Sequence, residues 1–301
     1  MIREVKDMIA TALLTSVMML ACALPPPAFT SETAQREFRE RDEINQTYQL
    51  APGTRVEVSS IRGGVEILNA DTSTAEVQIV RTARSRADLE YHKIEVEQTG
   101  NSLVVRGVQE PEQRQRQNIQ VNHHVVLKLP RSIDLTVKSV SGSLKAGDVD
   151  GQTHVFSISG SVKIGNVGNK LQVNSVSGNL EVGSVGADAH VNSISGNVRL
   201  GQVNGSLDVT SVSGGVNTTL VSLSPQGIRI RSVSGSVELG FKSDVNADFS
   251  AESVSGQVHL DVPNVTRDSE TNSSNVRARI GAGGTPITIW SVSGDIRLTR
   301  S

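Results

Sequence analysis

Residues 171–188 read LQVNSVSGNLEVGSVGAD, and this stretch decides the fold. Its centre is the tetrad Ser-Val-Ser-Gly at residues 175–178. With Ile allowed for Val, the same tetrad begins at Ser139, Ser157, Ser175, Ser193, Ser211, Ser232, Ser253 and Ser291. The first five starts are eighteen residues apart, the next two steps are twenty-one residues, and the last step is thirty-eight. A fixed period in this range is typical of a repeat architecture whose units stack on their neighbours.

The eighteen-residue unit divides into two halves of nine residues, of which the first carries the tetrad at places five to eight. Places one, three and six of both halves are apolar, as in Leu171, Val173 and Val176, then Leu180, Val182 and Val185. Alternation over the first four places indicates a strand, because neighbouring side chains of a strand point to opposite faces. We therefore expect Val176, Leu180, Val182, Ile194 and Val212 to be buried, and Lys163, Glu181 and Arg199 to be exposed.

Place eight of the tetrad-bearing half is glycine in every repeat, at Gly142, Gly160, Gly178, Gly196, Gly214, Gly235, Gly256 and Gly294. Glycine adopts positive φ without a Cβ clash, which a tight corner requires. Each half is thus expected to be a short strand and a corner, and two halves make one coil. The predicted fold class is an all-β, parallel β-solenoid of 18-residue coils with an antiparallel β cap at its N-terminal end.

Four regions are expected along the chain. Residues 1–23 are predicted to be a signal peptide, 24–50 a polar tether, 51–130 a first coil plus the antiparallel cap, and 131–301 the repeats with an insertion at 261–285. A cap is expected because the end of a solenoid exposes strand edges that can pair with another molecule. Self-association through either end of the solenoid is an open alternative. The Gly100-Asn101 pair indicates a hairpin within the cap.

The N-terminus has the features of an export signal. Residues 8–23 are almost wholly apolar and follow Arg3 and Lys6. Cleavage after Ala23 would discard Cys22, the only cysteine of the chain. Alternatively, residues 19–22 (MLAC) resemble a bacterial lipobox, in which Cys22 would be lipidated and anchor the protein to a membrane. The expected location is the periplasm, the outer membrane or the cell surface.

The sequence shows no catalytic constellation, no cofactor motif and no metal site. A formal net charge of −2 gives no general attraction to nucleic acid. His123 and His124 are neighbours in an expected strand and should face opposite ways, and His154 and His190 lie two coils apart. Asp148, Asp150 and Asp188 lie near expected corners, which leaves weak calcium binding open. No outward row concentrates the acids that a glycosidase needs, so we expect a protein that is not an enzyme.

Recognition is expected where the chain departs from its repeat. Phe156 and Trp290 occupy place four of their halves, which should face outward, and exposed aromatic rings can stack on sugars. Alternatively, Trp290 packs beneath the insertion at 261–285. The irregular segments 74–130 and 261–285 are the other candidates, because loops on a rigid scaffold commonly carry recognition.

Residues 139–144 (SVSGSL) and 291–296 (SVSGDI) resemble the repeats of the bacterial putative adhesin family, a domain of unknown function. The resemblance covers about residues 56–300 and implies a β-solenoid, adhesion by association, and no catalytic motif. We accordingly expect an exported, non-enzymatic envelope protein that binds an envelope polymer or protein, or acts as a scaffold. A polysaccharide-active β-helix enzyme and an envelope-stress regulatory component are the alternatives.

Overall fold

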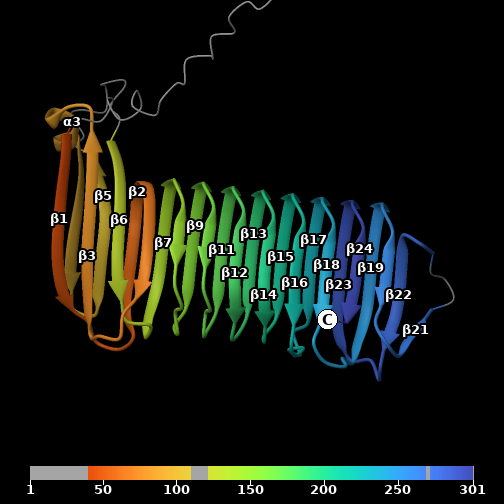
Figure 1. The fold of residues 1–301 in the computed structure, drawn as a ribbon. Helices are drawn as coiled ribbons and strands as arrows, with labels where there is room; N and C mark the ends of the chain where they lie inside the picture. Colours follow the sequence, from red (N-terminus) through yellow and green to blue (C-terminus); the bar gives the residue numbers. More distant parts are fainter. Residues whose placement is uncertain (1–39, 110–120, 269–271, 301) are drawn as a thin grey trace, which may run out of the picture. The chain divides into compact units, whose positions relative to one another are not determined.

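The computed structural model describes residues 40–109, 121–268 and 272–300. They form twenty-four strands and one short helix, α3 (Arg86–Tyr91), and the strands stack side by side (Figure 1). Within these ranges no helix is long and apolar enough to cross a membrane. The expected signal peptide at 1–23 and Cys22 lie outside the described residues.

The strands form two faces, which we name sheet A and sheet B. In pairing order, sheet A consists of β1 (Glu40–Gln49), β3 (Thr74–Ala83), β6 (Val121–Leu129), the second part of β2 (Thr54–Asn69), β8 (Leu144–Ala146), β10 (Val162–Ile164), β12 (Leu180–Val185), β14 (Val198–Val203), β16 (Val216–Leu220), β18 (Val237–Phe241), β24 (Ile296–Arg300) and β20 (Val258–Asp261). Sheet B consists of β4 (His92–Thr99), β5 (Ser102–Gln109), the first part of β2, β7 (Ile133–Ser141), β9 (Thr153–Ser159), β11 (Leu171–Ser177), β13 (Ala189–Ser195), β15 (Leu207–Ser213), β17 (Ile228–Ser234), β23 (Thr285–Ser293), β19 (Ala247–Ser255), β22 (Asn275–Ile280) and β21 (Val265–Arg267).

The repeat sets the register, and the predicted solenoid is confirmed. Parallel neighbours pair one coil apart, so that Leu171 lies opposite Ala189 and Ser175 opposite Ser193. Leucine, valine and isoleucine side chains from both sheets fill the space between them and form one continuous core. Lys163, Glu181 and Arg199 are exposed, while Leu180 and Val182 are buried, as the nine-residue pattern predicts.

The tetrad itself is oriented differently from our prediction. Ser175 is 4% exposed, whereas Val176, Ile194 and Val212 are 37%, 52% and 42% exposed, so the prediction that these three are buried is wrong. The alternation continues through place five, and the chain turns only after place six. The first serine of each tetrad therefore faces the core, and the following Val or Ile faces outward. In the other half of the coil the chain turns earlier, so that Val185 at place six is buried as expected.

The prediction of positive φ at the corner is confirmed for seven of the eight tetrad glycines. Seven of the eight have φ between +108° and +137°, and only Gly256 lies outside the left-handed region. A Cβ atom on Gly178, where φ is +124°, would lie 2.2 Å from the carbonyl oxygen of Gly160 in the preceding coil. The corners therefore stack too closely for any larger residue.

Acidic and amide side chains tie successive coils together. Asp148 Oδ1 accepts the amide of Asn166 at 2.7 Å, and Asn166 Oδ1 accepts the amide of Ser184 at 3.0 Å. Asp188 Oδ1 likewise accepts the hydroxyl and the amide of Ser206, which hold the pKa of Asp188 below its ordinary value. The acids near the corners thus have a structural use.

The order of the coils in space differs from their order in the chain. Strand β23 lies between β17 and β19, and its partner β24 lies between β18 and β20. The insertion expected at 261–285 supplies β22, which pairs antiparallel with β19 and buries Val276, Ala278 and Ile280. It therefore covers the C-terminal end of sheet B as a structural element, whereas we expected this insertion to be a candidate recognition segment.

The N-terminal cap contains the expected strands and one unexpected one. The sequence pattern predicts strands at 75–82, 93–98, 102–107 and 121–129, and β3, β4, β5 and β6 overlap these segments. The β4–β5 hairpin turns at Gly100, as predicted. Residues 40–49, however, which we placed in the tether, form β1 and pair antiparallel with β3. Only Ile44 and Tyr48 of β1 pack against the core, and so weak an apolar alternation is not recognisable in the sequence.

Candidate functional site

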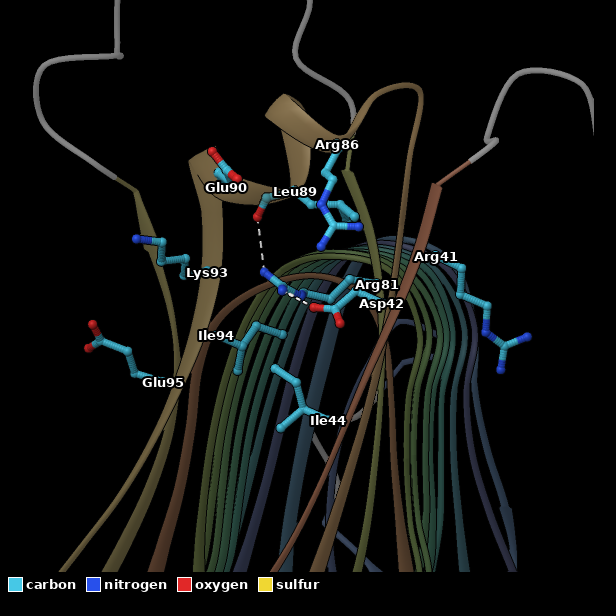
Figure 2. A pocket seen from close by; sticks show the side chains of 10 residues that line it. All are labelled: Arg41, Asp42, Ile44, Arg81, Arg86, Leu89, Glu90, Lys93, Ile94 and Glu95. Carbon is cyan, nitrogen blue, oxygen red and sulfur yellow. Dashed lines mark hydrogen bonds and ion pairs between the residues drawn. The ribbon is translucent and has the colours of Figure 1, made fainter.

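A pocket of about 350 Å³ lies at the N-terminal end of the stack, where sheet A ends at β1 and sheet B ends at β4 (Figure 2). Its lining combines three apolar side chains with seven charged ones: Ile44, Leu89 and Ile94, then Arg41, Asp42, Arg81, Arg86, Glu90, Lys93 and Glu95. A second hollow of about 380 Å³ over β1, β3 and β6 is lined mostly by polar side chains. The first is the better candidate, because small-molecule sites combine apolar walls with a few convergent polar groups.

Local sequence places the groups of this pocket. Asp42 and Ile44 are two of the inward positions of β1, and Arg81 is an inward position of β3, in line with the buried Val77 and Ile79. Helix α3, which supplies Arg86, Leu89 and Glu90 to the lining, begins where Ser85 caps its first turn by accepting the amide of Asp88 at 3.2 Å. The pocket thus lies between β1, β3, α3 and β4.

Arg81 holds these four elements together. Its Nη1 donates to the carbonyl oxygens of Leu89, at 3.0 Å, and of His92, at 3.1 Å, and its Nη2 pairs with Asp42. The side chain is only 11% exposed. Because its hydrogen bonds end on α3, β4 and β1, Arg81 is a fixed part of the pocket floor rather than a group free to bind a ligand.

Two histidines lie beside Arg81 in the interior. The rings of His92 and His123 meet edge to face with their centroids 6.3 Å apart, and His123 is the cross-strand neighbour of Arg81. Burial lowers the pKa of both histidines, and the neighbouring Arg81 charge lowers the pKa of His123 further. Both rings are therefore neutral at pH 7. His123 and His124 face opposite ways, as predicted, with His123 inward and His124 outward.

Arg86 is the cation of this pocket that remains available. Arg41 pairs with Glu43 at 3.5 Å, and Lys93 also has a partner. Arg86 forms no ion pair with any residue of the described part of the chain, and its guanidinium points into the pocket above Arg81 and Asp42 (Figure 2). A planar guanidinium over an apolar wall can bind a carboxylate or a phosphate.

The acids of the pocket do not form a catalytic pair. Asp42 is held by Arg81, and Glu95 is paired with Arg106 at 3.0 Å. Glu90 is then the one carboxylate of the described pocket lining that is not held by an arginine. Hydrolysis of a glycosidic bond requires two cooperating carboxyl groups. Among the described residues, no group of three or more His, Cys, Asp and Glu side chains is placed to hold a metal ion.

The structure does not bring Phe156 and Trp290 together. They are 45% and 39% exposed on the outer face of sheet B, on β9 and β23. Five strand spacings separate these strands, which corresponds to roughly 24 Å. Trp290 lies between Arg231 and Glu252 of the neighbouring strands, and its exposure shows that the insertion does not cover it.

Sequence reasoning missed the pocket, although one signal for it was present. Residues 75–79 alternate between apolar and polar side chains, and continuing the same alternation to residue 83 makes the inward positions Ala, Val, Ile, Arg and Ala. An arginine in an inward row requires buried partners. It therefore indicates a polar site inside the cap, but nothing in the local pattern identifies the partners.

The model of the Toastrack DUF4097 family matches residues 54–299. The chain belongs to this family. The matched range begins after β1, so Asp42 and Ile44 of the pocket precede the family-matched part of this Toastrack chain. No curated protein matches the sequence.

Several solved structures are similar to this Toastrack chain. A putative adhesin from Bacteroides fragilis is 12% identical, with 85% of this chain and 97% of that chain covered and a TM-score of 0.46. A putative adhesin from Parabacteroides distasonis is 10% identical, with 86% and 97% covered and a TM-score of 0.36. A putative cell adhesion protein from Clostridium sporogenes is 10% identical, with 87% and 100% covered and a TM-score of 0.28.

Proposed function

We propose that the protein is an exported, non-enzymatic binding protein of the bacterial envelope, and that the pocket between β1, β3, α3 and β4 is its ligand site. The observation that carries this proposal is the Arg86 guanidinium, which has no ion-pair partner among the described residues and faces the apolar wall of a pocket of about 350 Å³. The apolar leader at residues 8–23 supports export.

The lining favours a small anionic amphiphile. Arg86 offers a charge-assisted hydrogen bond to a carboxylate or phosphate headgroup. Ile44 and Ile94 offer an apolar surface beneath it, where each buried methylene group contributes about 0.8 kcal/mol. The pocket is near the lower end of the ~300–1,000 Å³ range of small-molecule sites, so the apolar part is a short chain.

The same geometry supports binding without turnover. The groups around the pocket are an arginine locked by three hydrogen-bond partners, two histidines whose pKa values are lowered, and carboxylates of which two are held by arginines. No described side chain of this set forms a nucleophile–base pair of the kind that covalent catalysis requires. An envelope-active hydrolase would need groups that this pocket lacks.

The proposal is tested by calorimetric titration of the full chain with sodium decanoate and with decyl phosphate. The wild type should bind at least one of them, and Arg86→Ala should weaken binding by about tenfold to a hundredfold, because a hydrogen bond to a charged group contributes about 1.5–3 kcal/mol. Lys163→Ala, which removes an exposed cation from sheet A, is the matched control and should change nothing. Failure of the wild type to bind either probe, or equal binding by Arg86→Ala, would refute the assignment.

A further inference from the structure

The outer face of sheet B gathers the exposed apolar residues of the protein. Among the described residues, ten large apolar side chains are exposed, and all except Leu68 lie on this face: Val140, Phe156, Ile158, Val176, Ile194, Val212, Val233, Val254 and Trp290. An exposed apolar patch of this extent marks an interaction surface. The order of the side chains within the patch indicates which kind of partner would cover it.

Three rows of side chains run along this face, across the eight strands β7, β9, β11, β13, β15, β17, β23 and β19 in that order. We name them rows two, four and six by their place in the nine-residue half. Row six is aliphatic on every strand: Val140, Ile158, Val176, Ile194, Val212, Val233, Val292 and Val254. It extends over seven strand spacings, or roughly 34 Å.

The aliphatic row is not a general feature of outward positions. Row two is polar on every strand: Thr136, His154, Gln172, His190, Asp208, Arg229, Thr288 and Ser250. Apart from the half-buried Val292, the residues of row six are 37–68% exposed, so burial in the core does not explain their apolar character. A row that is apolar without being buried is explained by a partner that covers it.

The outer positions of row four are chemically complementary about its centre. From β7 to β19 it reads Lys138, Phe156, Asn174, Asn192, Thr210, Arg231, Trp290 and Glu252. The two aromatic residues stand second from either end, and opposite charges occupy the two ends. A second copy of the same row, running in the reverse direction, is therefore complementary to it.

We infer that two copies of this chain pair face to face through sheet B, about a twofold axis that is parallel to the strands and passes between β13 and β15. Such an axis sets each row against itself and each strand against its counterpart from the other end. Row six of one copy then packs on row six of the other, with Ile194 opposite Val212 at the centre. The pairing buries the whole aliphatic row.

The polar and aromatic residues match under the same operation. Phe156 lies opposite Trp290 and Lys138 opposite Glu252, each twice in the dimer, and in row two His190 lies opposite Asp208. One strand farther out, Glu57 of β2 lies opposite Arg277 of β22, because these residues continue row two at the two ends. Like charges face each other nowhere in these rows, and aromatic pairs contribute about 0.5–1.5 kcal/mol beyond their burial.

A twofold axis along the stack gives no such match. An axis along the stack through row four would set Lys138, Arg231 and Glu252 each against its own copy, which places like charges together. The size of the proposed interface is also that of a stable dimer. Three rows over eight strands supply about two dozen residues from each copy, and protein interfaces of standard size have ~20–30 residues a side.

The existence of the dimer is tested by sedimentation velocity of the full chain over a concentration series. The wild type should be a dimer, and the double variant Ile194→Asp/Val212→Asp should be a monomer, because it places carboxylates opposite each other at the axis. Arg199→Asp, on the outer face of sheet A, is the matched control and should stay dimeric. Circular dichroism should show native β content in all three. A wild-type monomer at every concentration, or a double variant that remains a folded dimer, overturns the inference.

The orientation is tested by cross-linking in a Cys22→Ser background. Phe156→Cys/Trp290→Cys should form covalent dimers on mild oxidation, because Phe156 faces Trp290 of the other copy. Phe156→Cys alone should not, because its two copies lie about 24 Å apart across the axis. Lys138→Glu should weaken the dimer by about tenfold, and adding Glu252→Lys should restore it. Cross-linking by Phe156→Cys alone, or no restoration by the charge exchange, overturns the proposed axis.

Discussion

Replacing Gly178 with alanine tests the stacking of the corners. The substitution has two costs that the structure separates. Gly178 has φ of +124°, a region that residues with a Cβ atom rarely adopt, and its added Cβ would lie 2.2 Å from the Gly160 carbonyl oxygen. The corner must therefore change its dihedral angles and also move away from the coil beneath it.

The magnitude follows from these two effects. Backbone strain in a sparsely populated region costs about 1–3 kcal/mol. Relief of the contact moves the stacked corner against a packed core, which costs about 1–3 kcal/mol more. The lower entropy of the unfolded alanine chain offsets about 0.4–1 kcal/mol. We expect a net loss of about 3 kcal/mol, or a melting temperature lower by about 6–12 °C for a body of this size.

Two other glycines serve as matched controls. Gly284 has nearly the same φ, +122°, with nothing within 4 Å of its added Cβ, so Gly284→Ala measures the strain alone. Gly256 lies outside the left-handed region but would place its Cβ 2.3 Å from the Gly294 carbonyl oxygen, so Gly256→Ala measures the contact alone. Thermal unfolding followed by circular dichroism should show the largest effect for Gly178→Ala. If Gly178→Ala melts no lower than Gly284→Ala, the close stacking of the corners does not stabilise the fold.

Two further predictions concern the cap and the core. Burial lowers the pKa of His123, so the unfolded chain binds a proton at this histidine more tightly than the folded protein does. The free energy of unfolding is therefore highest above about pH 6.5, the ordinary pKa of histidine, and falls as the pH drops toward the lowered pKa of His123 in the folded protein. Denaturant titrations from pH 7.5 to 5 should show this decline, and His123→Gln should make it shallower, with the contribution of His92 remaining; an equal slope in both proteins would contradict the assignment. The inward Val191→Ala should cost about 2 kcal/mol, whereas the outward Ile194→Ala should stay within about 0.5 kcal/mol under monomeric conditions. Equal losses in urea titration would argue against the orientation of the tetrad.

The sequence predicted most of the solenoid because its information is local and repeated. Each nine-residue half specifies its own strand by alternation and its own corner by glycine, and eight copies give the same answer. The prediction for Val176 was wrong because two patterns conflict at places five and six. Strand alternation turns Ser175 at place five inward, whereas the apolar residue at place six of both halves suggested that place six is buried. Only the position of the turn in the structure decides which of the two side chains is buried.

Most of the candidate site could not be predicted from the sequence. Arg81 stands at a recognisably inward position, but its partners Asp42, Leu89 and His92 come from three separate elements of the cap. The predicted sugar contacts, Phe156 and Trp290, are exposed as expected, but they are separated by five strand spacings, and their pairing across a twofold axis depends on the spatial order of the coils.

The sequence by itself determined the coil, its eighteen-residue register, the inward and outward rows over places one to four, and the corners at the tetrad glycines. Tertiary structure alone decided that β23 enters the stack between β17 and β19, that β22 covers the end of sheet B, and that β1 completes sheet A. The physical reason is that every coil carries the same edge chemistry, so a strand can add to any free edge. The edge that it occupies is decided by competition among distant segments, and no local pattern records the outcome.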